Sequence, residues 1–223
     1  MYQAMTPVPL KLTDQQHERL RGLTVCHLVG LDSERHIRQQ LERLAAVPVD
    51  LLILTGPYVK GGLKAPESQI CNAVGFIEEV LNTVSPRYGA FGIFGAQDPR
   101  LFRSAVKAFK INWLKNKTIT HKALPLNITG VSERVGEHGS GDFLGAHLNG
   151  YEKTITQHLG LMLLPASDYL RYTGKVYHQV GYLRGEVSPF LRDGGNIQGG
   201  INCKDGWCEI EEDVGALPLF VLE

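Results

Sequence analysis

Short apolar runs recur along the first hundred residues of this chain, and a glycine follows each one. The runs and their glycines are 23–29 with Gly30, 51–55 with Gly56, and 90–94 with Gly95. Runs of this length with almost no polar alternation are typical of strands in a sheet that is covered on both faces. We therefore expect a buried sheet.

Amphipathic segments separate these runs and predict helices. The first follows Asp32 and has apolar residues at helical spacing over residues 37–44. The second spans residues 67–84, and the third, after Pro99, spans residues 101–109. The inward-facing residues of the second helix are Ile70, Val74, Ile77 and Leu81. Three successive strand–helix units predict an α/β domain with a largely parallel sheet.

Further strands are predicted in the rest of the chain, at residues 111–114, 126–131, 161–164, 176–180 and 217–222. Residues 132–150 are rich in glycine, histidine and glutamate and predict a long loop. No segment has the composition of a linker between domains. We therefore expect a single domain over residues 23–223, preceded by an N-terminal extension over residues 1–22.

Charge and hydropathy exclude several classes of protein. The chain has 23 basic and 23 acidic side chains, whereas nucleic-acid-binding proteins usually show a basic excess. No apolar run approaches the roughly 20 residues that span a bilayer. The N-terminal residues have neither the basic nor the apolar region of a secretory signal. We expect a cytoplasmic protein that spans no membrane and does not bind nucleic acid through bulk charge, although a local basic patch stays open.

Four cysteines in a chain of 223 residues do not make a disulfide scaffold. Cys26 and Cys71 lie in apolar patterns and are expected to be small buried residues. Cys203 and Cys208 flank the sequence Lys-Asp-Gly-Trp, which predicts a turn. They could be a pair across a hairpin or half of a metal knuckle. No second Cys or His pair lies nearby, which disfavours the metal.

Four segments, taken in order, resemble motifs of one protein family. They are residues 50–56 (DLLILTG), 88–95 (YGAFGIFG), 112–116 (NWLKN) and 185–190 (GEVSPF). Together they are similar to the calcineurin-like metallophosphoesterases, over nearly the whole chain from Leu23. The resemblance implies an α/β fold in which two sheets form a sandwich flanked by helices, in αββα layers. In that family the loops after the strands hold two metal ions.

The metal ligands of that family are substituted in this chain. The positions aligned with its motifs are Gly30, Asp32, Pro57, Ala96, Gln97, Asp98, Tyr182 and Arg184. In its third motif only Asp98 keeps the family's residue, an aspartate that there supports the histidine that protonates the leaving group. Pro57 stands where the family has the aspartate that bridges both metals, and Arg184 adds a positive charge where the family has a histidine. Two adjacent cations need a set of carboxylate, amide and imidazole donors. The resemblance therefore implies a degenerate site, and we expect no catalytic residue, metal or cofactor.

Some of these residues leave other interpretations open. Asp32 and Asp98 could together hold a single ion weakly, as in an atypical phosphoesterase with a reduced metal site. The more ordinary role of each aspartate is to cap the helix that follows it. Arg184 could bind an anion in a sensor of phosphorylated ligands. A hydrolase that uses the same cleft without a metal is a further alternative.

Histidines elsewhere do not predict a metal site. His27 and His178 lie in strand patterns and are expected to be core or edge residues. The long loop contains several possible ligands without a fixed ligand spacing, namely Glu133, Glu137, His138, Asp142 and His147. We interpret this segment as a solvated loop.

These features favour a protein-binding or structural subunit of a larger assembly over an enzyme. Tyr182, Arg184 and Phe220 are candidate partner contacts, because aromatic residues and arginine are enriched in interface hot spots. The strand predicted at 217–222 ends the chain early relative to the family. Its open edge could pair with a strand of a partner. We therefore expect other protein subunits as partners, with any small ligand unidentified.

Overall fold

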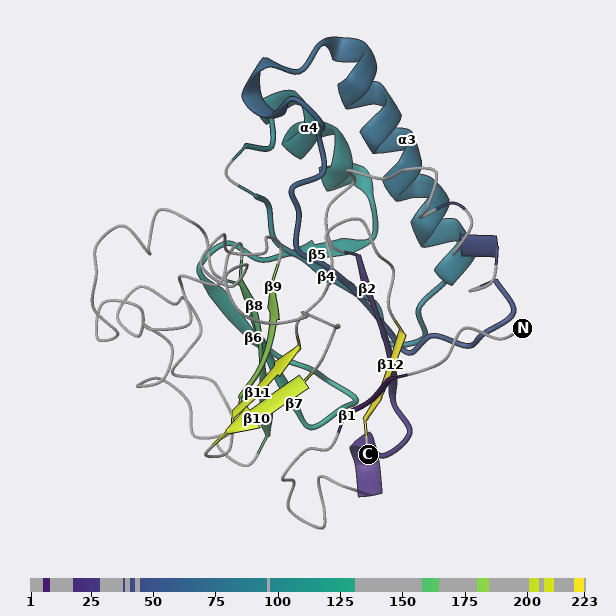
Figure 1. Cartoon of the computed structure of the whole chain (residues 1–223), viewed down its shortest axis with the longest axis vertical. Helices are drawn as coiled ribbons and strands as arrows, with labels where there is room; N and C mark the ends of the chain where they lie inside the picture. The colour runs from purple at the N-terminus through teal and green to yellow at the C-terminus, as the bar shows by residue number, and fades with distance from the viewer. Residues whose placement is uncertain are drawn as a thin grey trace, which may run out of the picture.

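Two β-sheets and a layer of helices make up the described part of the molecule (Figure 1). The computed structural model describes residues 6–8, 18–28, 38, 41–42, 45–95, 97–130, 158–164, 180–184, 201–204, 207–210 and 219–222. Each sheet has six strands, so the α/β class predicted from the sequence is confirmed. None of the helices in these residues is long and apolar enough to cross a membrane.

The first sheet contains the three apolar runs that stand out in the sequence. Its strands, in spatial order, are β1 (Thr6–Val8), β12 (Leu219–Leu222), β2 (Thr24–Leu28), β3 (Leu51–Leu54), β4 (Ala90–Gly92) and β5 (Ile111–Trp113). Strands β2 to β5 are mutually parallel, as the strand–helix alternation predicts. β12 is antiparallel to β2 and parallel to β1. The carboxyl ends of β2 to β5 therefore lie at one edge of the sheet.

Of the connections between the parallel strands, those from β3 to β4 and from β4 to β5 lie almost wholly within the described residues, and each contains a helix. α3 (Glu67–Val84) has the predicted bounds and ends at Ser85, whose φ of 42° is left-handed and whose N–H closes the last turn. α4 (Arg100–Ala105) is shorter than predicted because the chain tightens into a 3-10 helix, η2 (Val106–Ala108). Another 3-10 turn, η1 (Gly62–Lys64), lies between β3 and α3. These connections place α3 and α4 over the same sheet.

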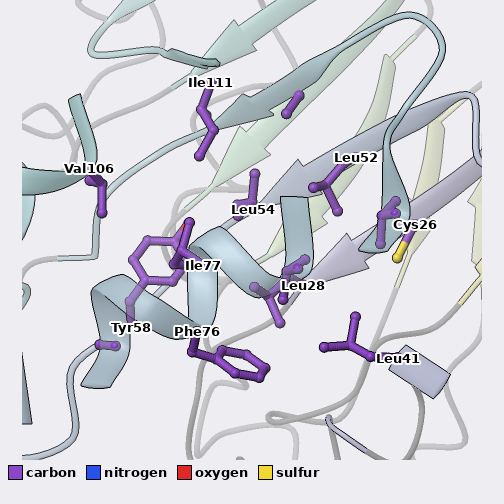
Figure 2. Close-up of a cluster of buried hydrophobic side chains, with 14 of the residues drawn as sticks. Cys26, Leu28, Leu41, Leu52, Leu54, Tyr58, Phe76, Ile77, Val106 and Ile111 are labelled. Atoms are coloured by element: carbon purple, nitrogen blue, oxygen red, sulfur yellow. The ribbon is translucent and has the colours of Figure 1, made fainter. Parts of the chain in front are cut away.

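An apolar core, which we call the helix-side core, fills the space between α3 and the first sheet (Figure 2). Phe76 and Ile77 of α3 pack with Leu28, Leu52 and Leu54 of the strands. The buried residues of α3 are Ile70, Ala73, Phe76, Ile77, Val80 and Val84. The predicted inward face of this helix is therefore confirmed in position, since its other two members, Val74 and Leu81, are partly buried against the same core.

The second sheet follows the first along the chain. Its strands, in spatial order, are β10 (Ile201–Lys204), β11 (Trp207–Ile210), β9 (Val180–Arg184), β8 (Leu159–Leu164), β7 (Leu126–Gly130) and β6 (Lys117–Thr120). Strands β7, β8, β9 and β11 run parallel, and β6 and β10 are antiparallel to their neighbours. β6, β10 and β11 were not predicted because each is short and half polar.

A second apolar core separates the two sheets. Leu51 and Ile53 of β3 face it, whereas Leu52 and Leu54 face the helices, so β3 is buried on both faces as predicted. The second sheet contributes Ile128 and its neighbours to this core. The layers are therefore helices, first sheet and second sheet. Because α3 and α4 both cover the first sheet, the fourth layer of the αββα arrangement stays a prediction.

Strand β12 is not the open edge that the sequence led us to expect. It lies between β1 and β2, and Phe220 pairs with Thr6 on one side and Val25 on the other. The expectation failed because residues 6–8 were assigned to an extension, whereas they form β1. Leu20 of the same segment is fully buried between the sheets. Addition of a partner strand beside β12 is therefore excluded in this arrangement.

Candidate functional site

The carboxyl ends of the parallel strands are where open α/β sheets bind ligands. Residues 55–59 follow β3, and residues 93–99 follow β4. We call these two segments the strand-end loops. They lead toward α3 and α4, at the helix-bearing end of the molecule (Figure 1). A metal centre of the kind found in the metallophosphoesterases that the sequence resembles would include these loops.

Two glycines let the strand-end loops approach each other at the level of the backbone. Gly56 has a φ of 62°, and a Cβ placed on it would lie 2.9 Å from the backbone nitrogen of Gly95. A Cβ on Gly95 would lie 3.1 Å from the Cα of Pro57. The peptide bond between Gly56 and Pro57 is cis. A side chain at either glycine would force the loops apart.

Asp98 links the two loops through hydrogen bonds. Its Oδ1 accepts from the backbone N–H of Tyr58 at 2.7 Å and from that of Val59 at 3.3 Å. Its Oδ2 accepts from the backbone N–H of Gly95 at 2.8 Å. The residue is only 1% exposed. Both carboxylate oxygens are therefore engaged by the backbone of the protein itself.

The predicted role of Asp98 as a helix cap is wrong. Pro99 occupies the N-cap position of α4, and no side chain caps that helix. An aspartate just before a proline and a helix suggests a cap when only neighbouring residues are considered. The actual partner, Tyr58, lies 40 residues earlier in the chain. The position of β3 beside β4 brings the two together.

Burial raises the pKa of Asp98 from 3.8 to about 6. Removal of the carboxylate from water is the largest cause, and the hydrogen bonds from Tyr58, Gly95 and Val59 and the charge of Arg103 act in the opposite direction. At neutral pH the group is ionised. Its negative charge is then balanced by three N–H dipoles and one guanidinium group.

Arg103 of α4 holds the second strand-end loop from its other side. Its Nε donates to the carbonyl of Asp98 at 2.9 Å, and its Nη2 donates to the carbonyl of Gly95 at 2.8 Å. The guanidinium carbon lies 5.5 Å from the centre of the Phe94 ring. Arg103 therefore fixes the backbone that presents Asp98.

Aromatic rings pack beneath the strand-end loops. The ring of Tyr58 stacks on Phe102 with centroids 5.4 Å apart, and the rings of Phe94 and Trp113 stack at 4.1 Å. The Tyr58 hydroxyl donates to the carbonyl of Ile93 at 2.8 Å. Burial raises the pKa of Tyr58 well above 10, so its phenol stays protonated at neutral pH. These side chains form a packed support under the loops.

His27 lies between the two sheets and is fully buried. Its Nε2 is 2.8 Å from Oγ1 of Thr55, which immediately follows β3. It shares a register row with Ile53 and Phe91, which belong to the core between the sheets. Burial lowers its pKa to about 3, so the imidazole is neutral at physiological pH. The prediction of a core histidine is confirmed.

The two sheets make direct contact near the same strand ends. Gly130 is the last residue of β7, and a Cβ placed on it would lie only 2.2 Å from the Cβ of Leu114. The same Cβ would lie 2.8 Å from Cγ2 of Ile93. Leu114 and Ile93 are buried in the core between the sheets. At this point the sheets therefore meet through apolar groups.

The structure places only some of the predicted site residues. Gly30, Asp32 and Ala96 lie outside the described residues. Pro57 is half-buried in the first strand-end loop, and Gln97 is exposed in the second. Of these positions, only Pro57 and Gln97 lie with Asp98 in the described loops.

Tyr182 and Arg184 belong to a strand rather than to a loop. They lie in β9, and Arg184 is its last residue. Of the strand predicted over residues 176–180, the structure describes only Val180, where β9 begins. Since they are two residues apart in one strand, Tyr182 and Arg184 lie on the same face of the second sheet.

The described residues do not fit the paired metal centre that the family resemblance implies. No three His, Cys, Asp or Glu side chains gather as a possible metal site within the described ranges. Asp98 directs both oxygens at backbone N–H groups, and Pro57 offers no side-chain donor. Asp32 and the loop over residues 132–150 lie outside the described residues. The described strand-end loops are thus arranged as a structural link.

A hollow of about 600 Å³ lies elsewhere on the first sheet. The end of α3, the start of β4 and the segment before β5 line it, including Leu81, Pro86 and Phe109. It therefore opens at the amino ends of these strands, opposite the strand-end loops. The hollow is not part of the candidate site.

Comparison with known proteins assigns no family to this chain. No family model matches it, and no match is found among the curated proteins. The geometry of the strand-end loops is therefore the basis for a functional proposal. Its main feature is a buried carboxylate that accepts three backbone hydrogen bonds beside a packed aromatic cluster.

Proposed function

We propose that this protein is a catalytically inactive domain with a metallophosphoesterase-like fold, and that it serves as a protein-binding subunit of a larger assembly. The fold part of the proposal is supported by two apposed sheets with parallel strands and by the order of the resembling segments. The observation that carries the inactive part is the engagement of Asp98 by the backbone of the strand-end loops.

A cation at Asp98 would have to replace hydrogen bonds that the loops already make. Coordination by Oδ1 or Oδ2 would compete with the N–H groups of Tyr58, Val59 and Gly95. A buried N–H group that loses its acceptor costs about 1–3 kcal/mol. The residue before Asp98 is Gln97, an exposed amide at the position where the family has the histidine that protonates the leaving group. These features support a structural use of the motif.

Two exposed leucines support the protein-binding part of the proposal. Leu63 of η1 is 64% exposed and Leu101 of α4 is 65% exposed. The turn η1 lies against the second strand-end loop, because a Cβ placed on Gly62 would lie 3.1 Å from the Cβ of Gln97. Leu63 follows Gly62 directly, and Leu101 lies one turn beyond Gln97. Leu63 therefore belongs to a turn that touches the second strand-end loop, and Leu101 to the helix that begins where this loop ends.

Charged residues near these leucines in the sequence indicate what kind of partner would bind. Lys60 and Lys64 lie within three residues of Leu63 in the sequence, Arg100 directly precedes Leu101, and all three cations are exposed. The exposed acidic residue of these segments is Glu67. We call Leu63, Leu101 and the three cations the leucine patch. A local basic excess in a chain of zero net charge favours an acidic polypeptide with apolar anchors.

The binding test compares the full chain with the double variant Leu63→Ser and Leu101→Ser. The immobilised wild type should retain an acidic polypeptide from an extract of the native source, and the variant should lose most of it. The matched control is Lys107→Ser with Lys110→Ser, two exposed cations outside the patch, which should bind as the wild type does. Equal recovery by all three proteins, or release by nuclease treatment, would contradict an acidic protein partner at this patch.

The catalytic test measures hydrolysis of a generic phosphodiester with added Mn²⁺. We expect no turnover above that of the protein-free solution. Turnover that disappears in Asp98→Asn would contradict the inactive assignment and favour the atypical phosphoesterase. Because this assay does not involve the leucine patch, it tests inactivity separately from partner binding.

A further inference from the structure

Two cysteines occupy opposite positions in the hairpin formed by β10 and β11. Cys203 and Cys208 are partners in the register of this antiparallel pair. Lys204 and Trp207 form the adjacent pair and are separated by two residues, Asp-Gly, in the sequence. Asp-Gly is a strong signal for a type I′ hairpin turn. Register and sequence therefore agree on a tight hairpin with the cysteines one pair away from its turn.

The position of this pair in the ladder determines the distance between the two backbones. In antiparallel strands, pairs that exchange both hydrogen bonds alternate with pairs that exchange none. The pair that closes a two-residue loop is hydrogen-bonded, so the next pair, Cys203 with Cys208, is not. The Cα atoms of such a pair are about 4.5 Å apart, within the range of roughly 4.4–6.8 Å seen in disulfides.

The neighbouring strand has a glycine beside this pair in the register. β9 places Gly181 opposite Cys208, and glycine has no side chain to compete for the space. The same row continues to Leu161 of β8, which is buried in the core between the sheets. Register partners lie on one face of a sheet. Cys203 and Cys208 therefore belong to the same register row as Leu161.

We propose that Cys203 and Cys208 form a reversible intramolecular disulfide that fixes the β10–β11 hairpin at the edge of the second sheet. One thiolate attacks oxidised glutathione and releases one reduced glutathione, and the second thiol then displaces the other from the mixed disulfide. Two electrons and two protons pass to the glutathione, so one oxidised molecule becomes two reduced ones. The proposal is independent of the function proposed for the leucine patch.

The test treats the native full chain with oxidised glutathione, alkylates the remaining thiols and digests the product with trypsin. Trypsin cleaves after Lys204, between the two cysteines, so the disulfide would join the peptides 193–204 and 205–223. We expect this linked species at a mass two hydrogen atoms below the sum of the peptides, and its loss on reduction. The equilibrium constant for its formation should be roughly tenfold or more above that of the chain unfolded in urea.

Variants separate this pair from the other cysteines. Cys203→Ser should abolish the linked species. The matched control is Cys71→Ser in α3, which should leave the linked species unchanged. Cys71 is exposed, so the expectation that it is buried is wrong, whereas Cys26 is buried as expected. Recovery of both peptides with alkylated or glutathionylated cysteines would overturn the proposal, as would linkage to Cys26 or Cys71. Equal equilibrium constants in the native and unfolded chains would also overturn it, because the folded hairpin would then give no advantage.

Discussion

The helix-side core and the strand-end loops belong to the same sheet but are stabilised in different ways. In the core, Phe76 and Ile77 gain stability from many apolar contacts, none of which depends on a single atom. In the loops, three hydrogen bonds converge on the one carboxylate of Asp98. In the core, the free energy of unfolding should therefore fall when side-chain volume is removed. In the loops, it should depend on the charge of Asp98 and on pH. Five substitutions test this difference.

The largest effect is expected in the helix-side core. Phe76 is 1% exposed and fills the space between α3 and the strands. Phe76→Ala should lower the free energy of unfolding by about 3–5 kcal/mol, because it removes buried apolar surface and leaves a cavity. Denaturant unfolding at pH 5 and pH 7.5 measures the loss. Equal losses at the two pH values are expected, and a marked difference would contradict a purely apolar role.

Asp98→Ala should lower the free energy of unfolding by about 3 kcal/mol at pH 7.5, since three buried N–H groups lose their acceptor. The loss should be larger at pH 5. The pKa of Asp98 is about 6 in the folded chain, above the ordinary value of 3.8 for an aspartate. Folding therefore takes up a proton at pH values between about 3.8 and 6. This group therefore favours folding more at low pH, by up to about 3 kcal/mol.

A conservative variant checks that hydrogen-bond acceptance by Asp98 causes this effect. Asp98→Asn keeps one acceptor oxygen but places an amide N–H₂ where the second oxygen was, so one loop N–H still loses its acceptor. Its loss of stability should be smaller than that of Asp98→Ala at each pH. The loss should likewise be larger at pH 5 than at pH 7.5, because neither variant keeps the titrating carboxyl group. Two variants as stable as the wild type would contradict the linking role.

The next effect concerns the slope of stability with pH. The pKa of His27 is about 3 in the folded chain, below 6.5, so the unfolded chain binds the proton first as pH falls. His27 should thus lower the free energy of unfolding by about 1.4 kcal/mol for each pH unit below 6.5. Between pH 6 and 4, Asp98 changes the free energy of unfolding in the opposite direction. His27→Gln should therefore gain stability relative to the wild type as pH is lowered. Unfolding curves at several pH values measure it, and parallel curves would contradict the assignment.

The smallest effect is expected at the leucine patch. Leu101 is 65% exposed, so Leu101→Ser removes little buried surface. The free energy of unfolding should change by less than about 0.5 kcal/mol. The same measurement supports the binding test, because a variant of normal stability that loses the partner has lost a contact. A loss above 2 kcal/mol would show that this leucine belongs to the core.

Apolar periodicity predicted much of the first sheet and its covering helix. β3 is a run of four apolar residues whose alternate members face the two cores, and α3 begins and ends at the predicted residues. These elements could be predicted because burial on a face leaves a local repeat in the sequence. The strands β6, β10 and β11 leave no such repeat and were not predicted, although the sequence Lys-Asp-Gly-Trp indicated a turn between the last two.

The chemistry of the candidate site could be predicted only in part. Asp98 was singled out, but its partners Tyr58 and Val59 come from the neighbouring strand end, and local sequence indicated a helix cap instead. Arg103 was not singled out, since an arginine in an amphipathic helix is ordinarily solvated. His27 was predicted as a core residue, but its contact with Thr55 depends on the parallel pairing of β2 and β3. Long-range pairing decides each of these roles.

Calorimetric titration of the full chain with Mn²⁺ tests most directly whether the strand-end loops form a structural link rather than a metal centre. Because the oxygens of Asp98 are bound by three backbone N–H groups, we predict no saturable heat of binding and no change in the unfolding midpoint on adding the metal. Saturable binding of one or two ions per chain, with a higher unfolding midpoint, would contradict the account.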